Sequence, residues 1–195
     1  MADVTKSEFI LGGQKSGKSR RAEQCAAAWL ALSHGHRAVL VATAEAHDDE
    51  MRARILRHQQ DRAVRVPGMT TVEEPSALAE AIASHSKPGT LVVVDCLTLW
   101  LTHLLMPYRA AAAAAATDTA SDAAQRIAAL VDAIRNARGP VVLGGNEIGL
   151  GVIPLGGETR AFVDALGRLN QDVAAACDRV TLMVAGLPLT LKAPV

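Results

Sequence analysis

What the sequence lacks already narrows the classes of protein to which it can belong. Its 195 residues carry 20 basic and 20 acidic side chains, so no net charge attracts nucleic acid or an anionic membrane. Aromatic residues are scarce, with two Trp, two Phe and one Tyr, which leaves no stacking platform for single-stranded nucleic acid. We therefore expect no nucleic-acid partner, and any anion site must be local.

Cysteine and long apolar segments are also limited. The three cysteines, Cys25, Cys96 and Cys177, are widely spaced and form no C-x-x-C pair, which argues against a disulfide framework or a zinc site. They are interpreted as buried apolar residues of a reducing compartment. The N-terminus has no basic segment followed by an apolar one, and no stretch reaches the roughly 18 apolar residues of a membrane span except through alanine. We expect no membrane span and a cytoplasmic location.

Short continuous apolar runs alternate with helical patterns along the chain. The runs, which are typical of strands covered on both faces, lie at 9–11, 38–42, 90–94, 140–143 and 180–184. Helical patterns lie at 18–33, 48–59, 75–85, 121–137 and 158–177. This order predicts one α/β domain over residues 1–195, a mainly parallel sheet flanked by helices, with ligands at the carboxyl ends of its strands. The alanine run at 110–116 fits either a helix or a mobile excursion and is assigned no chemistry.

The segment GGQKSGKS follows the first predicted strand and begins the first predicted helix. This setting identifies a P-loop for a nucleoside triphosphate rather than an ordinary glycine-rich turn. Its backbone N–H groups can converge on phosphate oxygens at the helix N-terminus, Lys18 can reach the β- and γ-phosphates, and Ser19 can bind Mg²⁺. The loop residues are Gly12, Gly13, Gln14, Lys15, Ser16, Gly17, Lys18 and Ser19.

Asp95 ends the apolar run 91–94, which places a carboxylate at the sheet edge where the P-loop also lies. This position suits a Walker B residue that holds the Mg²⁺ of a bound nucleotide directly or through water. The alternative is that Asp95 caps the next helix, and the two roles are compatible.

The segment 48–62 is predicted to be a helix, with acidic residues in its first turn and basic residues at its end, as the helix dipole favours. His58 continues an apolar stripe of this helix, and such a histidine is more often a packed core residue than a catalytic one. Here, however, Arg54, Arg57 and Arg62 surround it. These cations could bind a polyphosphate and would depress the pKa of the imidazole, which keeps a nucleophilic nitrogen available.

The glycine-rich segment Gly144–Pro154, GGNEIGLGVIP, follows the fourth predicted strand directly. Its glycines permit close approach of the backbone to a ligand, while Asn146 and Glu147 supply polar groups at the ligand-binding end of the sheet. A merely structural turn would need fewer glycines. We therefore interpret the segment as a candidate substrate-binding loop.

Taken together, these segments resemble the bifunctional adenosylcobinamide kinase / adenosylcobinamide-phosphate guanylyltransferase family of cobalamin biosynthesis. The family's opening GGxxSGKSxxAE stands at 12–23, and its D-D-E-M-x-x-R-I-x-x-H-x-x-x-R segment stands at 48–62. Its N-E-x-G-x-G-x-x-P loop stands at 146–154, and a helix with GRLNQ follows at 167–171. The resemblance spans almost the whole chain.

This resemblance implies a P-loop, RecA-like fold, commonly a homotrimer, and a histidine, here His58, that forms a covalent GMP intermediate. The implied substrates are GTP or ATP with Mg²⁺, adenosylcobinamide and adenosylcobinamide phosphate. Ser19 and Asp95 would hold the Mg²⁺, while Asn146 and Glu147 would contact the corrinoid. The implied nucleotide contacts are residues 12–19 with Ala42, Thr43, Ala44, Gln59, Gln60, Asp61, Arg62, Glu73 and Asp95.

On this interpretation the chain first phosphorylates the terminal hydroxyl of the aminopropanol arm of adenosylcobinamide. It then transfers GMP from His58 to the new phosphate, which gives adenosylcobinamide-GDP. One alternative is a P-loop kinase of another small metabolite, in which His58 is structural. Another is a RecA-like ATPase or nucleotide-gated regulator that binds a partner and transfers nothing.

Overall fold

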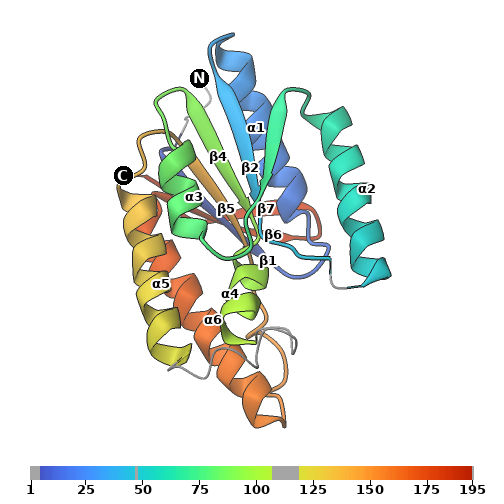
Figure 1. Cartoon of the computed structure of the whole chain (residues 1–195), viewed down its shortest axis with the longest axis vertical. Coiled ribbons are helices and arrows are strands. Elements are labelled where there is room, and N and C mark those ends of the chain that lie inside the picture. The colour runs from blue at the N-terminus through green and yellow to red at the C-terminus, as the bar shows by residue number, and fades with distance from the viewer. Residues whose placement is uncertain (1–4, 47, 107–118, 195) are drawn as a thin grey trace.

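Seven strands form one sheet in the computed structural model, which describes residues 5–46, 48–106 and 119–194 (Figure 1). Across the sheet the order is β3-β2-β4-β5-β1-β6-β7, and every neighbouring pair of described strands is parallel except β6 and β7, which are antiparallel. The predicted α/β class with a mainly parallel sheet is therefore confirmed. The strands are β1 Ser7–Gly12, β2 Arg37–Ala42, β3 Met69–Glu73, β4 Thr90–Asp95, β5 Val141–Asn146, β6 Arg179–Val184 and β7 Leu187–Lys192.

Helices cover both faces of the sheet, because alternate residues of its central strands enter two different cores. Phe9 and Leu11 of β1 pack with apolar residues of α3, α4, α5 and α6, whereas Ile10 packs on the opposite face with α1. In β4, Val94 and Val93 divide in the same way. A strand that is buried on both faces needs an apolar residue at nearly every position, which explains the continuous runs. The helices are α1 Lys18–Leu32, α2 Asp49–Arg65, α3 Leu78–His85, α4 Leu97–Leu105, α5 Thr119–Arg135 and α6 Gly157–Ala176.

Three described elements were not predicted, each for a physical reason. In β3, at one edge of the sheet, Thr70, Thr71 and Glu73 are exposed, so the strand has no apolar run. In α4, Leu97–Leu105, apolar residues crowd every face and hide the helical period. The strand β7 forms the other edge and pairs with β6 through a turn in which Ala185 and Gly186 have positive φ.

The helix α2 is longer than predicted, since its helical pattern ends at residue 59 and the segment singled out for its charges ends at residue 62. It continues to Arg65, and the N–H of Val66 still donates to the carbonyl of Arg62 at 2.8 Å. Arg62 and Val66 are both buried, so packing against the sheet extends the helix beyond its amphipathic pattern. The alanine run at 110–116 lies outside the described residues.

The cysteines agree in the main with their interpretation as apolar residues. Cys96 and Cys177 are buried, while Cys25 is half-buried. Burial raises the pKa of the Cys177 thiol to about 12 and those of Cys25 and Cys96 to about 11, so all three stay protonated at neutral pH. Among the described helices, none has the length and apolarity to cross a bilayer. The cytoplasmic location stays a prediction.

Close packing at the start of β5 generates a test of the fold. A Cβ at Gly139 would overlap the carbonyl oxygens of Lys87 and Thr90, so Gly139→Ala is expected to lower the free energy of unfolding by about 1–3 kcal/mol. The matched control is Gly167→Ala inside α6, where a Cβ meets nothing within 4 Å. That change is expected to stabilise the protein by about 0.5–1 kcal/mol through helix propensity. Urea unfolding of both variants measures the difference, and equal effects would contradict the packing at Gly139.

Candidate functional site

The carboxyl ends of four parallel strands meet at one edge of the sheet and bring most of the predicted site residues together (Figure 1). In the strand register, Gly12 at the end of β1 is opposite Asn146 of β5, and Ala42 at the end of β2 is opposite Asp95 of β4. Ligands of open α/β sheets bind outside this edge. The carboxyl ends of these strands, marked by Gly12, Ala42, Asp95 and Asn146, are therefore the candidate site, and we call this region the nucleotide edge.

The P-loop conformation depends on its glycines and on a turn from the far end of the chain. Gly17 has φ 105° and Gly12 has φ 154°, and a Cβ at Gly12 would lie 2.6 Å from the carbonyl oxygen of Met183. The N–H of Gly186 donates to the carbonyl of Ser16 at 3.0 Å, so the β6–β7 turn is hydrogen-bonded to the P-loop. Within the described part of the chain, the buried Ser16 hydroxyl has no hydrogen-bond partner, as suits a donor in an anion-binding loop.

Lys18 lies in the first turn of α1, and its Nζ donates to the carbonyls of Gly12 at 2.9 Å and Gly13 at 2.7 Å. Burial lowers the pKa of Lys18, against the opposing attraction of the Asp95 carboxylate. The ammonium is thus held inside the loop by neutral carbonyls, which a phosphate oxygen can replace with a charge-assisted bond.

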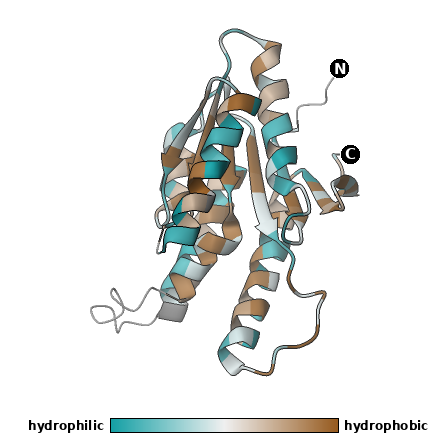
Figure 2. Ribbon diagram, turned by 90° about the vertical axis from the view of Figure 1, so that its right-hand side faces the viewer, coloured by the Kyte–Doolittle hydropathy of each residue, from teal (hydrophilic) through white to brown (hydrophobic). Residues whose placement is uncertain are grey.

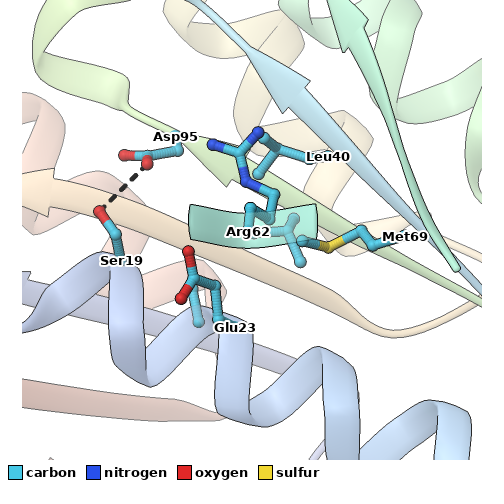
Figure 3. A pocket seen from close by; sticks show the side chains of 8 residues that line it. Ser19, Glu23, Leu40, Arg62, Met69 and Asp95 are labelled. Atoms are coloured by element: carbon cyan, nitrogen blue, oxygen red, sulfur yellow. Dashed lines mark hydrogen bonds between the residues drawn. The ribbon is translucent and has the colours of Figure 1, made fainter. Parts of the chain in front are cut away.

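Ser19 and Asp95 are in direct contact, since the Ser19 hydroxyl donates to Asp95 Oδ2 at 3.1 Å (Figure 3). The described residues contain no cluster of three or more His, Cys, Asp or Glu side chains that could cage a metal. Mg²⁺ usually needs only one or two protein oxygens, because water and phosphates fill its other positions. The pair therefore fits a Mg²⁺ that arrives with a nucleotide. The interpretation of Asp95 as a helix cap is wrong, because α4 begins after Cys96, which stands at the cap position.

Thr43, at the end of β2, is fully buried and holds the chain that follows Asp95. Its hydroxyl donates to the carbonyl of Cys96 at 2.8 Å and accepts from the N–H of the same residue at 2.9 Å. The side chain of Thr43 therefore has a structural task. Ala42 and Ala44, on either side, are half-buried at the same edge.

A small pocket beside Ser19 and Asp95 contains Arg62, which reaches in from α2 (Figure 3). Its side chain is only 8% exposed, and Nη1 donates to the Thr71 hydroxyl at 3.3 Å. A buried guanidinium that lines the same pocket as Ser19 and Asp95 is well placed to meet a polyphosphate. The other members of this pocket wall include Glu23, Leu40 and Met69.

His58 is exposed, and it is not among the residues that line this pocket. The interpretation of His58 as a packed core residue is therefore wrong. The stripe that suggested it is only partly buried at Met51 and Ile55. Arg57 is exposed as well, and the side chain of Arg54 lies outside those described.

The remaining predicted residues of this region lie on α2 and β3. Gln59 Nε2 donates to Glu73 Oε1 at 3.4 Å, which joins two predicted nucleotide contacts. Asp61 pairs with Arg65 at 3.2 Å on the helix surface, and Gln60 is exposed. The helix begins as expected for a capped one, because the Asp48 carboxylate accepts from the N–H of Met51 at 2.7 Å.

The end of β5 is held on both sides. The N–H of Asn146 donates to the Thr98 hydroxyl at 2.8 Å, and its carbonyl accepts from Asn170 Nδ2 at 3.1 Å. The next residue, Glu147, donates its N–H to the carbonyl of Gly12 at 3.2 Å and thereby joins the glycine-rich loop to the P-loop. The roles of Thr98 and Asn170 were not predicted. For Asn170 the sequence does hold a signal, because this polar residue lies on the apolar stripe of α6 formed by Leu166, Leu169 and Val173. A polar side chain on a buried stripe indicates a specific hydrogen bond.

Comparison with known proteins matches one family model and two curated proteins over nearly the whole chain. Residues 8–191 match the family model described as cobinamide kinase / cobinamide phosphate guanyltransferase. The chain is 44% identical over 190 residues to the bifunctional adenosylcobalamin biosynthesis protein CobP of Pseudomonas aeruginosa, covering 95% of this chain and 96% of that protein. It is 34% identical over 189 residues to the Escherichia coli protein CobU, covering 94% and 98%. The flagellar accessory protein FlaH of Methanocaldococcus jannaschii gives a TM-score of 0.49 at 10% identity, covering 97% and 79%.

The position of Lys18 generates the first test of this site. Lys18→Ala should weaken binding of a nucleoside triphosphate by at least about tenfold, because a hydrogen bond to a charged group is worth about 1.5–3 kcal/mol. Lys87→Ala is the control, since Lys87 is exposed and precedes β4, at the amino-terminal end of the strands and away from the nucleotide edge. Calorimetric titration with GTP compares the two variants. Unchanged affinity in Lys18→Ala would remove the P-loop assignment.

Asp95 generates a second test, which concerns the metal. Asp95→Asn keeps the shape of the side chain and removes its charge, so nucleotide turnover should need on the order of tenfold more Mg²⁺. Asp164→Asn, an exposed position on α6, is the control and should leave the titration unchanged. If both variants give the wild-type magnesium curve, Asp95 has no role at the metal.

Proposed function

Because the chain belongs to the cobinamide kinase / cobinamide phosphate guanyltransferase family, we propose that it phosphorylates adenosylcobinamide and then converts the product to adenosylcobinamide-GDP. The observation that carries this proposal is the joint position of a complete P-loop, the Ser19–Asp95 pair and the Asn146 loop at one edge of the sheet. The arrangement provides a triphosphate site and an adjacent place for an acceptor. The family match over residues 8–191 supports a cobinamide as that acceptor.

In the proposed kinase step, the arm hydroxyl of adenosylcobinamide attacks the γ-phosphorus of GTP or ATP. A bond forms between the hydroxyl oxygen and phosphorus, the bond to the bridging oxygen breaks, and the hydroxyl loses its proton to solvent. Lys18 leaves the carbonyls of Gly12 and Gly13 to neutralise the phosphates. Ser19 and Asp95 would hold Mg²⁺, which supplies charge stabilisation to the transferring group.

In the proposed guanylyltransferase step, an imidazole nitrogen of His58 attacks the α-phosphorus of GTP. The nitrogen–phosphorus bond forms as pyrophosphate leaves, and the phosphate of the corrinoid then attacks the same phosphorus and releases the histidine. A protein nucleophile divides a difficult displacement between two anions into two easier steps. The exposure of His58 supports this role, because a nucleophile must be accessible to two substrates in turn.

The shape of α2 suggests how His58 reaches the nucleotide. The last turn of the helix is anchored by buried Arg62 and by Arg65, which pairs with Glu23 of α1 at 3.2 Å. Residues closer to its start, including Leu56 and His58, are exposed. In the proposed cycle, the free end of α2 swings about this anchor to bring His58 to the α-phosphorus. Arg62, at the anchor, can hold the triphosphate in both positions.

We further propose a homotrimer on the basis of family resemblance. Closed symmetry of this kind could bring residues of a neighbouring copy to the acceptor side of the nucleotide edge. Light scattering on the purified protein measures the assembly, and a monomer mass at working concentration would contradict the trimer.

The covalent step generates the sharpest test. His58→Ala should fold, bind GTP and lose the covalent GMP adduct completely, while phosphorylation of adenosylcobinamide should survive at least in part. His34→Ala is the matched control, because His34 is exposed in the turn between α1 and β2 and should leave the adduct unchanged. Mass spectrometry after incubation with GTP and Mg²⁺ detects the adduct, which should be labile in acid and stable in base as a phosphoramidate.

Two outcomes would overturn this mechanism. An adduct that survives in His58→Ala, or that maps to another residue, would remove His58 as the nucleophile. Phosphorylation of adenosylcobinamide by the wild-type protein without any GMP adduct would leave a P-loop kinase that lacks the second activity.

A further inference from the structure

The segment 147–156 between β5 and α6, here called the apolar loop, exposes an unusual amount of apolar surface. In Figure 2 the loop that enters α6 is largely brown, and its apolar residues are Ile148, Leu150, Val152, Ile153 and Leu155. Leu150, Val152 and Leu155 are 84%, 95% and 97% exposed. Single exposed apolar residues are normal, whereas several that follow one another mark a binding surface.

Hydrogen bonds hold both ends of the apolar loop in place. At its start, the N–H of Glu147 donates to Gly12 of the P-loop at 3.2 Å, and the Glu147 carboxylate accepts from the N–H of Gly149 at 2.8 Å. At its end, Arg160 of α6 donates from Nη1 to the carbonyls of Pro154 at 3.0 Å and Leu155 at 2.6 Å. The exposed side chains are therefore presented beside the P-loop by a loop whose ends are fixed.

The chemistry of the apolar loop identifies the kind of ligand that it can take. Glu147 is the sole charged residue between positions 147 and 156, and no basic side chain in that stretch could attract a phosphate. The loop is thus unsuited to a nucleotide and suited to a broad, uncharged surface with exposed methyl or methylene groups. A corrin is a wide, flattened macrocycle that carries methyl groups and uncharged amide side chains at its edge.

We propose that the apolar loop binds the corrin ring of the acceptor and positions its hydroxyl arm over the P-loop. This inference rests on the proposed function, and it assigns the ring to Leu150, Val152 and their neighbours, whereas the phosphates belong to Lys18 and Ser19. The connection from Gly12 to Glu147 places ring and phosphate sites side by side, so the arm needs to span only the boundary between them. The loop thereby selects the acceptor, and it has no part in the attack of His58 on GTP.

The experiment compares the wild-type protein with the double variant Leu150→Ser/Val152→Ser. Both side chains are exposed, so their replacement should not unfold the protein. The control is Leu191→Ser, which removes an equally apolar side chain, 56% exposed, from the edge strand β7. For each protein we would measure the KM for adenosylcobinamide and for GTP. Equilibrium dialysis, followed by the visible absorbance of the corrinoid, gives the Kd for adenosylcobinamide. The yield of GMP adduct from GTP alone and the mass by light scattering complete the set.

The expected result is a rise of about tenfold or more in the KM and dialysis Kd for adenosylcobinamide in the double variant. Its KM for GTP, its adduct yield and its mass should equal those of the wild type, and Leu191→Ser should match the wild type throughout. Unchanged corrinoid affinity in the double variant, while the wild type still turns over adenosylcobinamide, would overturn this inference alone. A smaller mass in the double variant would also overturn it, because the loop would then be a contact between copies. A wild-type protein that neither binds nor phosphorylates adenosylcobinamide would overturn the proposed function itself.

Discussion

Parallel strands end together at one edge of their sheet, and the candidate site depends on this constraint. The end of β1 begins the P-loop, the end of β4 supplies Asp95, and the end of β5 begins the apolar loop. Since β5 lies between β1 and β4, Asn146 is opposite Gly12 in the strand register and Gly144 is opposite Asp95. Residues that lie far apart in the chain, such as Gly12 and Asn146, thereby become neighbours without any specific long-range attraction between their side chains.

The strand ends would not stay in this arrangement without contacts from outside the parallel sheet. Thr98 and Asn170 hold the backbone of Asn146, Thr43 holds Cys96, and the β6–β7 turn holds Ser16. Each contact pairs a backbone group at a point where the regular strand ladder has ended, and an unpaired buried group there would be costly. These contacts satisfy backbone groups that the strand ends leave open, whereas among the described residues the buried Ser16 hydroxyl of the P-loop stays without a partner.

How far the sequence predicts this structure depends on whether a signal is local. The buried strands and the P-loop were predicted, because continuous apolar runs and the G-x-x-x-x-G-K-S spacing are local patterns. The edge strands β3 and β7 were not, since an edge position leaves a strand half exposed and its partner is a distant segment. Asp95 illustrates the limit at one residue: the sequence placed it correctly at the end of β4, but only the structure shows that Cys96 takes the cap position and that Asp95 accepts from Ser19. The exposure of His58 was likewise hidden, because a helical stripe does not indicate how closely a helix approaches the sheet.

The two proposed reactions make different demands on the two helices that carry their residues. The γ-phosphate must be met by groups that are already in place, and α1 meets this demand because Lys18 and Ser19 extend directly from the buried strand β1 through a loop fixed by Gly12 and Gly17. The α-phosphate must instead meet a nucleophile that afterwards gives way to the corrinoid phosphate. A residue fixed at the nucleotide edge would obstruct the acceptor in the first reaction. An exposed histidine on a helix that is anchored mainly at its last turn avoids this conflict, because the solvated His58 can approach for one step and withdraw for the next. On the proposed function, the exposure of His58 on α2 thus allows both reactions to use one P-loop.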